Sequence, residues 1–308
     1  MRAVRFDRYG GVDELYVAEV EDPGAGPGEL VVRVRAAGIN PGEASIRRGS
    51  LHERWPATFP SGEGSDFAGV VSAVGEGVTA FSVGDEVLGW SDRRSSHAEL
   101  VAVPEDHVVA KPPGLPWEVA GSLFVVGTTA YAAARAVGAG PGDTVVVSAA
   151  SGGVGSVTVQ LCRLRGAEVV GIASGANHDW LRSVGVVPVD HLGGPDALAA
   201  RIREAAPGGV DAFIDTFGPE YVRLAVDLGV APQRIETITA WDAAREIGAK
   251  TDGSATAATA GVLREMTALV ASGRIEVPVA ATYPLDDVRA AYRRLEQRHT
   301  RGKIVLVP

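Results

Sequence analysis

The sequence is poor in the side chains that hold metal ions and disulfides. It has a single cysteine, Cys162, among 308 residues, so no internal disulfide can form and a zinc site built on cysteines is excluded. Because Cys162 falls on the apolar side of a predicted helix, we expect a small core residue rather than a nucleophile. The six histidines show no ligand spacing such as H-x-x-x-H, which argues against a catalytic zinc ion.

Long apolar runs and an excess of positive charge are also absent. No apolar run approaches the roughly 18 residues of a membrane-spanning helix, and the amino terminus lacks the apolar centre of a signal peptide. The net charge of −9 argues against nucleic acid or an anionic membrane as the main partner. We therefore expect a cytoplasmic protein that acts on a small-molecule substrate.

Residues 1 to about 110 are rich in glycine, proline and valine, and short strand patterns alternate there with turn signals. The expected strands are Arg2–Phe6, Glu29–Ala37, Asp66–Val74, Glu86–Trp90 and His97–Pro104. This pattern indicates a β-rich domain rather than part of a doubly wound sheet.

From about Pro116 onwards, helix and strand patterns alternate. A helix is expected over Trp117–Ala136, and strands over Thr144–Val147, Val169–Ala173, Val186–Val189, Ala212–Asp215 and Ile235–Ile238. Such alternation predicts a parallel sheet. The last patterns are helices at Thr256–Ser272 and Asp286–Gln297, an extended run at Ile275–Thr282 and a strand at Lys303–Val307. We expect this end to return to the first domain.

One βαβ unit, Thr144 to Ser174, carries the main functional signal. Its first strand leads into the turn Ser151-Gly152-Gly153-Val154-Gly155, and an amphipathic segment and a second apolar run follow. Glycines between a strand and a helix let the backbone approach a pyrophosphate, which then lies on helix N–H groups. The full G-x-G-x-x-G is not met, and a βα turn that binds nothing is the alternative. No Lys-Ser/Thr pair follows, which argues against a nucleoside triphosphatase.

The residues after the second strand of this unit bear on which dinucleotide is bound. An NAD site usually has a carboxylate there for the ribose 2′-hydroxyl, but this strand ends without one. Ser174, Asn177 and His178 can instead accommodate a 2′-phosphate, and Arg182 and His191 can add positive charge. The sequence therefore favours NADP(H) over NAD(H). The alternative is a set of solvated helix-start residues in which Asn177 is an N-cap.

Separated segments together resemble the zinc-independent medium-chain dehydrogenase/reductases, in the quinone oxidoreductase (ζ-crystallin-like) branch. The matching segments are AAGINPGEASIRRG (36–49), GSDFAGVVSAVGEGVTAFSVGDEVLG (64–89), GTTAYAA (127–133), SAASGGVG (148–155) and RGKIVL (301–306). The resemblance implies an α/β protein with a GroES-like β-rich catalytic domain and a doubly wound parallel-sheet Rossmann cofactor domain. The implied boundaries are 1–122 for the catalytic domain, 123–262 for the NADP-binding domain and 263–308 for the returning segment.

The activity implied by the resemblance is hydride transfer from NADPH to a quinone or an α,β-unsaturated carbonyl compound, in a cleft between the domains of a homodimer. Two alternatives stay open. One is a reductase of enoyl thioesters or a biosynthetic intermediate, and the other is an NADPH-binding protein with little turnover. Negative charge that develops on the substrate carbonyl oxygen needs hydrogen-bond donors, which could be the amide of Asn40, a backbone N–H or water. We find no convincing side-chain proton donor and expect protonation by solvent.

Site residues carried over by position come from both domains. Asn40 should line the nicotinamide and substrate end, and with Ser45 it is a candidate catalytic residue. The candidate cofactor contacts are Asn40, Thr128, Ser151, Gly152, Gly153, Val154, Gly155, Ser174, His178, His191 and Lys303. Simpler interpretations are a turn residue before Pro41 for Asn40, a helix-stabilising hydroxyl for Thr128 and a solvated strand-edge charge for Lys303.

The chain also departs from the family pattern. Ser45 stands where many quinone reductases have tyrosine, and Leu51 falls near an aromatic position, so the pocket wall is expected to differ. Arg47 and Arg48 could bind an acidic substrate, but surface helix charges are the favoured interpretation. Zinc-dependent relatives place ligands in segments that here contain Asn40 and Ser65-Asp66, so no metal is expected. Asp66 is interpreted as a structural carboxylate that caps backbone N–H groups.

Overall fold

A computed structural model describes the whole chain, Met1–Pro308, which folds into two compact units. Unit 1 comprises Met1–Val125 and Thr259–Pro308, and unit 2 comprises Val126–Ala258. None of the helices is long and apolar enough to cross a bilayer.

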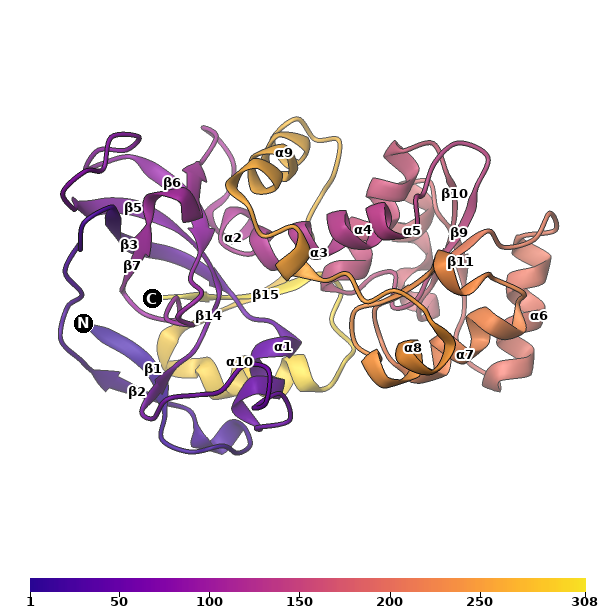
Figure 1. Ribbon diagram of the computed structural model, residues 1–308, viewed down its shortest axis with the longest axis horizontal. Coiled ribbons are helices and arrows are strands. Elements are labelled where there is room, and N and C mark those ends of the chain that lie inside the picture. The colour runs from indigo at the N-terminus through magenta and orange to yellow at the C-terminus, as the bar shows by residue number, and fades with distance from the viewer. The chain divides into compact units, whose positions relative to one another are not determined.

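Unit 1 is built on β-sheet (Figure 1). Its strands are β1 (Arg2–Phe6), β2 (Tyr16–Glu19), β3 (Glu29–Gly38), β4 (Ser61–Gly62), β5 (Asp66–Val74), β6 (Glu86–Trp90), β7 (Leu100–Pro104), β8 (Val108–Ala110), β14 (Val279–Pro284) and β15 (Lys303–Val307). Seven strands form one sheet in the order β14-β15-β3-β5-β6-β8, with β7 paired to β3, and β2-β1-β4 form a second. Side chains of β3, β5, β6, β7 and β8 pack into one apolar cluster between these strands.

The helices of unit 1 lie around this sheet. They are α1 (Pro41–Arg47), α2 (Trp117–Ala120), the first residues of α3 (Leu123–Ala136), α9 (Ala260–Ala271), α10 (Val288–Glu296) and the 3₁₀ turns η1 (Val12–Glu14), η2 (Glu105–His107) and η6 (Leu285–Asp287). Residues of α10 and β15 join β1 and α1 in a second core cluster, so the carboxyl-terminal segment is an integral part of unit 1.

Two helices differ from the expected ones. The single helix predicted over residues 117–136 is interrupted between α2 and α3, because Gly121 packs directly on β3. Its carbonyl oxygen accepts from the N–H of Gly38 at 2.7 Å, and a Cβ on Gly121 would lie 2.3 Å from the carbonyl oxygen of Ala36. Helix α9 begins at Ala260 rather than at residue 256, because the hydroxyl of Thr259 caps it by accepting from the N–H of Val262 at 3.2 Å.

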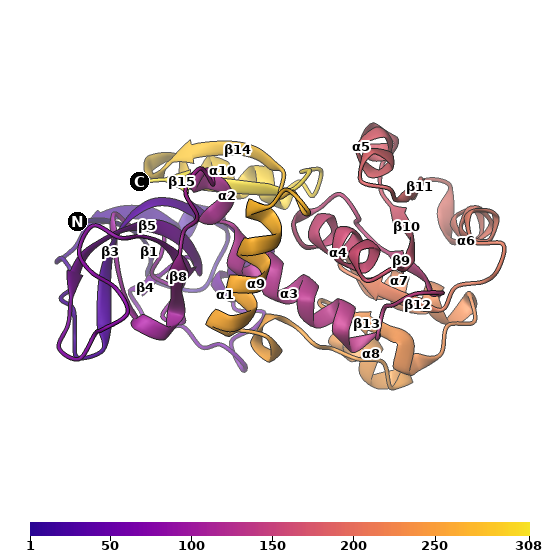
Figure 2. The ribbon, with the colours of Figure 1, turned by 90° about the horizontal axis from the view of Figure 1, so that it is seen from above.

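Unit 2 is a five-stranded parallel sheet between helices (Figures 1 and 2). The strand order is β11-β10-β9-β12-β13, with β9 (Thr144–Val147), β10 (Glu168–Ile172), β11 (Val187–Val189), β12 (Ala212–Asp215) and β13 (Ile235–Thr237). The helices are the rest of α3, α4 (Gly153–Leu164), α5 (His178–Ser183), α6 (Gly194–Ala205), α7 (Pro219–Asp227), α8 (Trp241–Ile247) and the 3₁₀ turns η3 (Gly175–Asn177), η4 (Pro232–Arg234) and η5 (Ser254–Thr256).

Successive side chains of a strand point to opposite faces of the sheet, and unit 2 has an apolar core on each face. Val145 and Val147 of β9 face α3, α4 and α5, whereas Val146 faces the cluster that includes α6 and α7. Cys162 is fully buried in the first cluster, which confirms its prediction as a core residue. Because all five strands are parallel, their carboxyl ends meet at one edge, where ligands of such sheets usually bind.

Candidate functional site

The glycine turn of unit 2 connects β9 to α4 and has the shape that an anion-binding turn needs. Ala149 adopts a φ of +42°, and its carbonyl oxygen accepts from the N–H of Gly152 at 2.8 Å. A Cβ on Gly155 would lie 2.2 Å from the same oxygen, so a side chain there would displace the turn. The N–H groups of Gly153, Val154 and Gly155 form the first turn of α4, where no intrahelical acceptor exists. They can therefore bind an anion such as a pyrophosphate.

The loop after β10 contains the residues predicted for the adenosine end of a cofactor. The hydroxyl of Ser174 accepts from the side-chain amide of Asn177 at 3.0 Å. Asn177 is the N-cap residue of α5, but its side chain makes no capping hydrogen bond to that helix and donates to Ser174 instead. The ring of His178 is half-buried, and its Nε2 lies 3.3 Å from the carbonyl oxygen of Ala173. That hydrogen bond needs the proton on Nε2, which leaves Nδ1 for another partner.

A carboxylate also reaches this loop, from the end of the neighbouring strand β11. Asp190 follows β11, which runs parallel to β10, so both strands end at the same edge. One oxygen of Asp190 lies 3.4 Å from the position of a Cβ on Gly175, and the other accepts from the N–H of Leu192 at 2.8 Å. The N–H of Leu192, and then the charges of His191 and His178, hold the pKa of Asp190 below its ordinary value. The strand β10 itself ends without an acid, as the sequence shows, but its pairing with β11 brings one to the same loop.

The other predicted residues of unit 2 are dispersed. Thr128 on α3 is fully buried, and its hydroxyl lies 2.8 Å from that of Ser254 in η5. Ser151 is buried at the start of the glycine turn. His191 is exposed, with Nδ1 3.8 Å from the carboxylate of Asp190. Unit 2 therefore brings Ser174, His178 and His191 around one loop, whereas Thr128 contacts a different segment.

In unit 1, Asn40 lies in a buried polar cluster at the start of α1. Its amide nitrogen is 3.1 Å from Oε1 of Glu43 and 3.1 Å from Oδ2 of Asp66, and its amide oxygen accepts from Nζ of Lys303 at 2.5 Å. An ammonium can only donate and a carboxylate can only accept, so these partners fix the orientation of the amide. Both amide hydrogens are engaged within unit 1, and neither is left for a substrate oxygen.

Lys303 supplies the positive charge of this cluster. It is only 3% exposed, so its interpretation as a solvated strand-edge charge is wrong. Nζ also donates to the carbonyl oxygen of Ile39 at 3.0 Å and lies 3.4 Å from Oδ2 of Asp66. The other oxygen of Asp66 accepts from the N–H of Val125 at 2.7 Å, which confirms its predicted capping role. Burial raises the pKa of Asp66, and the ammonium of Lys303 opposes that rise.

Glu43 links Asn40 to α10, and the sequence analysis did not single it out. One oxygen of Glu43 accepts from the N–H of Asn40 at 2.8 Å and from the hydroxyl of Tyr292 at 2.9 Å. Its other oxygen accepts from the N–H of Ser65 at 2.9 Å. The spacing Asn-x-x-Glu at the start of a helix was a signal for this residue, because the third helical position often returns to the N-cap N–H.

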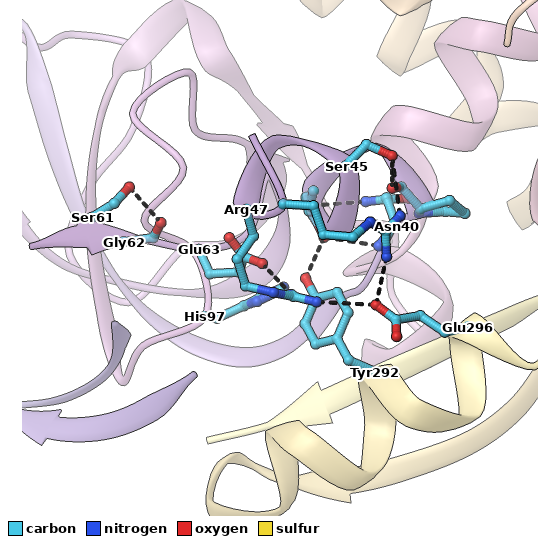
Figure 3. A network of polar contacts seen from close by, with 12 residues as sticks. Asn40, Ser45, Arg47, Ser61, Gly62, Glu63, His97, Tyr292 and Glu296 are labelled. Carbon is cyan, nitrogen blue, oxygen red and sulfur yellow. Dashed lines mark hydrogen bonds and ion pairs between the residues drawn. The ribbon is translucent and has the colours of Figure 1, made fainter. Parts of the chain in front are cut away.

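Arg47 extends the network across α1 and α10 (Figure 3). Its fully buried guanidinium donates to Glu63 at 2.8 Å and to Glu296 at 3.1 Å, and it lies 4.6 Å from the ring centroid of Tyr292. The interpretation of Arg47 as a surface helix charge is therefore wrong. Arg48 is 43% exposed and shares Glu296 at 2.8 Å, as expected of a surface residue. Arg47 therefore has a structural role, because both carboxylates that it contacts, Glu63 and Glu296, belong to unit 1.

Ser45 and Leu51 occupy half-buried positions near α1. The hydroxyl of Ser45 donates to the carbonyl oxygen of Pro41 at 3.1 Å, one helical turn earlier. A serine that bonds to its own helix fills less space than the tyrosine that the family pattern would place there.

Asp215, at the carboxyl end of β12, is a further residue that the sequence analysis missed. It accepts from the hydroxyls of Ser148 and Thr237, each at 2.7 Å, and from the N–H of Phe217 at 2.9 Å. It therefore ties together the ends of β9, β12 and β13. Burial raises the pKa of Asp215, and its hydrogen-bond donors oppose that rise. An acid that ends a buried apolar strand was the available signal.

No group of three or more His, Cys, Asp or Glu side chains is arranged to hold a metal. Asn40 and Asp66, which lie in the segments that the family resemblance relates to zinc ligands, are both bound by the ammonium of Lys303. A second cation at those oxygens would meet like-charge repulsion.

Comparison with known proteins identifies the class. The family model of an alcohol dehydrogenase GroES-like domain matches residues 26–113, and that of a zinc-binding dehydrogenase matches residues 187–306. The synaptic vesicle membrane protein VAT-1 homolog of Rattus norvegicus is 30% identical over 345 residues, covering 100% of this chain and 84% of that protein. Quinone oxidoreductase of the same species is 35% identical over 175 residues, covering 56% of this chain and 53% of that protein.

A solved structure extends the similarity to the whole fold. Escherichia coli quinone oxidoreductase complexed with NADPH is 25% identical, with a TM-score of 0.87 and 100% of both chains covered. A β-rich GroES-like unit joined to a parallel-sheet unit with a glycine turn defines a two-domain dehydrogenase or reductase, which confirms the predicted fold class. The chain belongs to the medium-chain dehydrogenase/reductase family and is an NAD(P)-dependent oxidoreductase.

Proposed function

We propose that the protein is an NADPH-dependent, metal-free reductase that transfers hydride to a quinone or an α,β-unsaturated carbonyl compound. The observation that carries this proposal is the turn between β9 and α4, in which a Cβ on Gly155 would lie 2.2 Å from the carbonyl oxygen of Ala149. A backbone held that closely, at a helix start and at the carboxyl edge of a parallel sheet, fits a dinucleotide pyrophosphate. The NADPH complex of the E. coli relative supports the choice of cofactor.

Cofactor binding is assigned to the predicted domain 123–262, and substrate binding to 1–122 with 263–308. Ser151, Gly152, Gly153, Val154 and Gly155 would hold the pyrophosphate through backbone N–H groups. Farther along the chain, Ser174, His178 and His191 would meet the ribose 2′-phosphate, and Thr128 would contact the rest of the dinucleotide. NADPH supplies a hydride to the acceptor when it is bound.

In unit 1, the residues proposed to lie near the hydride acceptor form a buried polar cluster around Asn40. Lys303, Glu43 and Asp66 hold the amide of Asn40 in one orientation, so Asn40 presents a fixed surface rather than a free donor. Charge that develops on the acceptor oxygen would then be stabilised by backbone N–H groups or water, and solvent would supply the proton. This arrangement suits acceptors that take a hydride without an alkoxide, such as quinones and conjugated enones.

The metal-free assignment is supported by the donor set. The amide oxygen of Asn40 and Oδ2 of Asp66 are already bound by the ammonium of Lys303, and the single cysteine lies in the core of unit 2. We further propose a cytoplasmic homodimer, in line with the family resemblance. Light scattering after size-exclusion chromatography measures the assembly.

The proposal is tested by following NADPH oxidation at 340 nm with 1,4-benzoquinone, a simple enone and an enoyl thioester in parallel. We expect oxidation with the quinone or the enone, unchanged after treatment with a chelator. Activity only with the thioester would move the assignment to the narrower reductase. Bound NADPH that reduces none of the acceptors would favour a binding protein with little turnover, and activity lost on chelation would overturn the metal-free assignment.

A further inference from the structure

The carboxylate of Asp190 lies where an acid can change the relative affinity of the site for NADH and NADPH. Acids that select NAD usually end the second strand of the nucleotide-binding unit, where they accept from the ribose 2′-hydroxyl. Here β10 ends without an acid, but β11 delivers Asp190 to the loop that follows β10. One oxygen of Asp190 lies 3.4 Å from the position of a Cβ on Gly175, the residue next to Ser174. The acid therefore faces the same loop from the neighbouring strand.

Asp190 is held in place and held ionised. Its Oδ1 accepts from the N–H of Leu192 at 2.8 Å, and its Oδ2 is directed at Gly175, whose backbone N–H also lowers the pKa of Asp190. The N–H of Leu192 is the main cause that keeps the pKa of Asp190 below its ordinary value. A full negative charge near a 2′-phosphate would oppose NADPH, whereas the same carboxylate could accept from the free 2′-hydroxyl of NADH.

Most of the permanent cations around this loop have other partners. On α5, Arg182 is paired with Asp179 at 2.8 Å. On α6, Arg201 donates through Nε to the carbonyl oxygen of Asp190 at 3.0 Å and through Nη2 to that of Leu192. The other basic side chains of the loop, His178 and His191, are imidazoles that carry no permanent charge.

These two histidines flank the carboxylate from both sides. His178 begins α5 with Nε2 3.3 Å from the carbonyl oxygen of Ala173, and His191 directly follows Asp190 with Nδ1 3.8 Å from its Oδ1. When protonated, His178 also gains a donor at Nδ1. The net charge of Asp190, His178 and His191 therefore runs from −1 with both rings neutral to +1 with both protonated.

We propose that Asp190 is a specificity-determining residue that limits the preference for NADPH over NADH, and that protonation of His178 and His191 offsets it, so that the preference for NADPH grows as pH falls. The inference rests on the proposed binding of a dinucleotide by unit 2. It adds that the selectivity of this site is set by a carboxylate from β11 and is tuned by pH. A phosphate pocket lined by lysine or arginine would instead keep its preference across the neutral range.

The test measures the dissociation constants of NADPH and NADH by isothermal titration at pH 6.5 and 8.5, at constant ionic strength, without any acceptor. For the wild type we expect the ratio of Kd for NADH to Kd for NADPH to be at least fivefold larger at pH 6.5. For Asp190→Asn we expect NADPH to bind about tenfold more tightly at pH 8.5, with NADH unchanged or weaker. Asparagine keeps an oxygen that can accept from the N–H of Leu192, so the loop should retain its shape.

Two further sets of variants test the charges of the histidines and of Asp190 separately. His178→Gln combined with His191→Gln should flatten the pH dependence of the ratio, although the cofactor's own 2′-phosphate, with a second pKa of about 6, still titrates in that variant. Asp196→Asn removes the same charge six residues along the chain, at the start of α6, and should change the ratio by less than twofold. Asp190→Ser replaces Asp190→Asn if circular dichroism finds the latter unfolded.

The possible results distinguish a failure of the proposal for Asp190 from a failure of the proposed function. If both dinucleotides bind the wild type and Asp190→Asn leaves their ratio within twofold, the role of Asp190 is overturned while cofactor binding stands. A ratio that changes with pH equally in the double histidine variant removes the histidines from the proposal. If the folded wild type binds neither dinucleotide, the proposed function fails and the inference fails with it.

Discussion

Nζ of Lys303 lies 2.5 Å from the amide oxygen of Asn40, which joins the last strand of the chain to the first residue of the predicted substrate site. The ammonium is buried, and it also meets Oδ2 of Asp66 at 3.4 Å. Lys303 is therefore a positioning residue for Asn40 in this structure, because it fixes which way the amide faces. Its contact with a cofactor stays a prediction.

Replacement of this ammonium tests its electrostatic role. Lys303→Met leaves Asp66 buried without its cation, and we expect a loss of about 3 kcal/mol in the free energy of unfolding. Guanidinium unfolding at pH 7 measures it. The matched variant Lys303→Met with Asp66→Asn removes both charges and should recover at least about 1 kcal/mol of that loss. Strictly additive losses would show that the two groups do not act as a pair.

The sequence predicted the strands better than the contacts between side chains. Strand bounds at Arg2–Phe6, Asp66–Val74 and Ala212–Asp215 are confirmed, because apolar periodicity and turn residues are local signals. The break at Gly121 escaped prediction, because it depends on Ala36 and Gly38 of a distant strand. Helix propensity within residues 117–136 carries no information about that contact.

The same distinction between local patterns and contacts of distant residues applies to the candidate site. The glycine turn is a local pattern and was found from its glycines and its place between a strand and a helix. Asp190 was missed because its relation to Ser174 arises from the pairing of β10 with β11, and Arg47 was misplaced because its partner Glu296 is 249 residues away. Family resemblance supplied candidate positions such as Lys303, but only the fold shows that its ammonium is directed at Asn40.

Gly155→Ala tests the turn that carries the proposed function. The new methyl group would lie 2.2 Å from the carbonyl oxygen of Ala149, so the turn must open and its N–H groups must move. We expect NADPH to bind at least tenfold more weakly, as measured by titration calorimetry, in a protein that remains folded. Gly208→Ala is the control, because a Cβ there meets nothing within 4 Å, and its affinity should equal that of the wild type.

Glu236 on β13 predicts a pH dependence of stability. It is fully buried, and burial raises its pKa from 4.5 to about 8, although the backbone N–H of Asp252 and the ammonium of Lys250 oppose that rise. The folded state therefore keeps this proton up to about pH 8, whereas the unfolded chain releases it near pH 4.5. Because the folded state binds more protons in that window, stability falls as pH rises through it.

Guanidinium unfolding at intervals from pH 5 to pH 8.5 measures this slope. We expect Glu236 to account for a loss of a few kcal/mol, at most about 4, over that range. Glu236→Gln is uncharged at every pH, so it should be more stable than the wild type at pH 8.5 and show a shallower slope. Parallel slopes in the two proteins would mean that Glu236 is ionised in the folded state.

Arg47 and Arg48 form a matched pair, since they are consecutive, share Glu296 and differ in burial. Arg47→Met leaves Glu63 with no ion-pair partner in a site that is 0% exposed, where burial already raises the pKa of Glu63 to about 8 and the guanidinium opposes that rise. At pH 8.5, where the carboxyl is ionised, we expect a loss of about 3–5 kcal/mol in the free energy of unfolding. Arg48→Met removes a contact that water can replace, and we expect a change within about 0.5 kcal/mol. Urea unfolding of both variants in 0.1 M and 1 M NaCl measures the difference, and salt should reduce only the smaller effect because buried pairs are poorly screened. Equal losses would contradict the burial of Arg47 and restore the acidic-substrate interpretation, in which either arginine faces solvent.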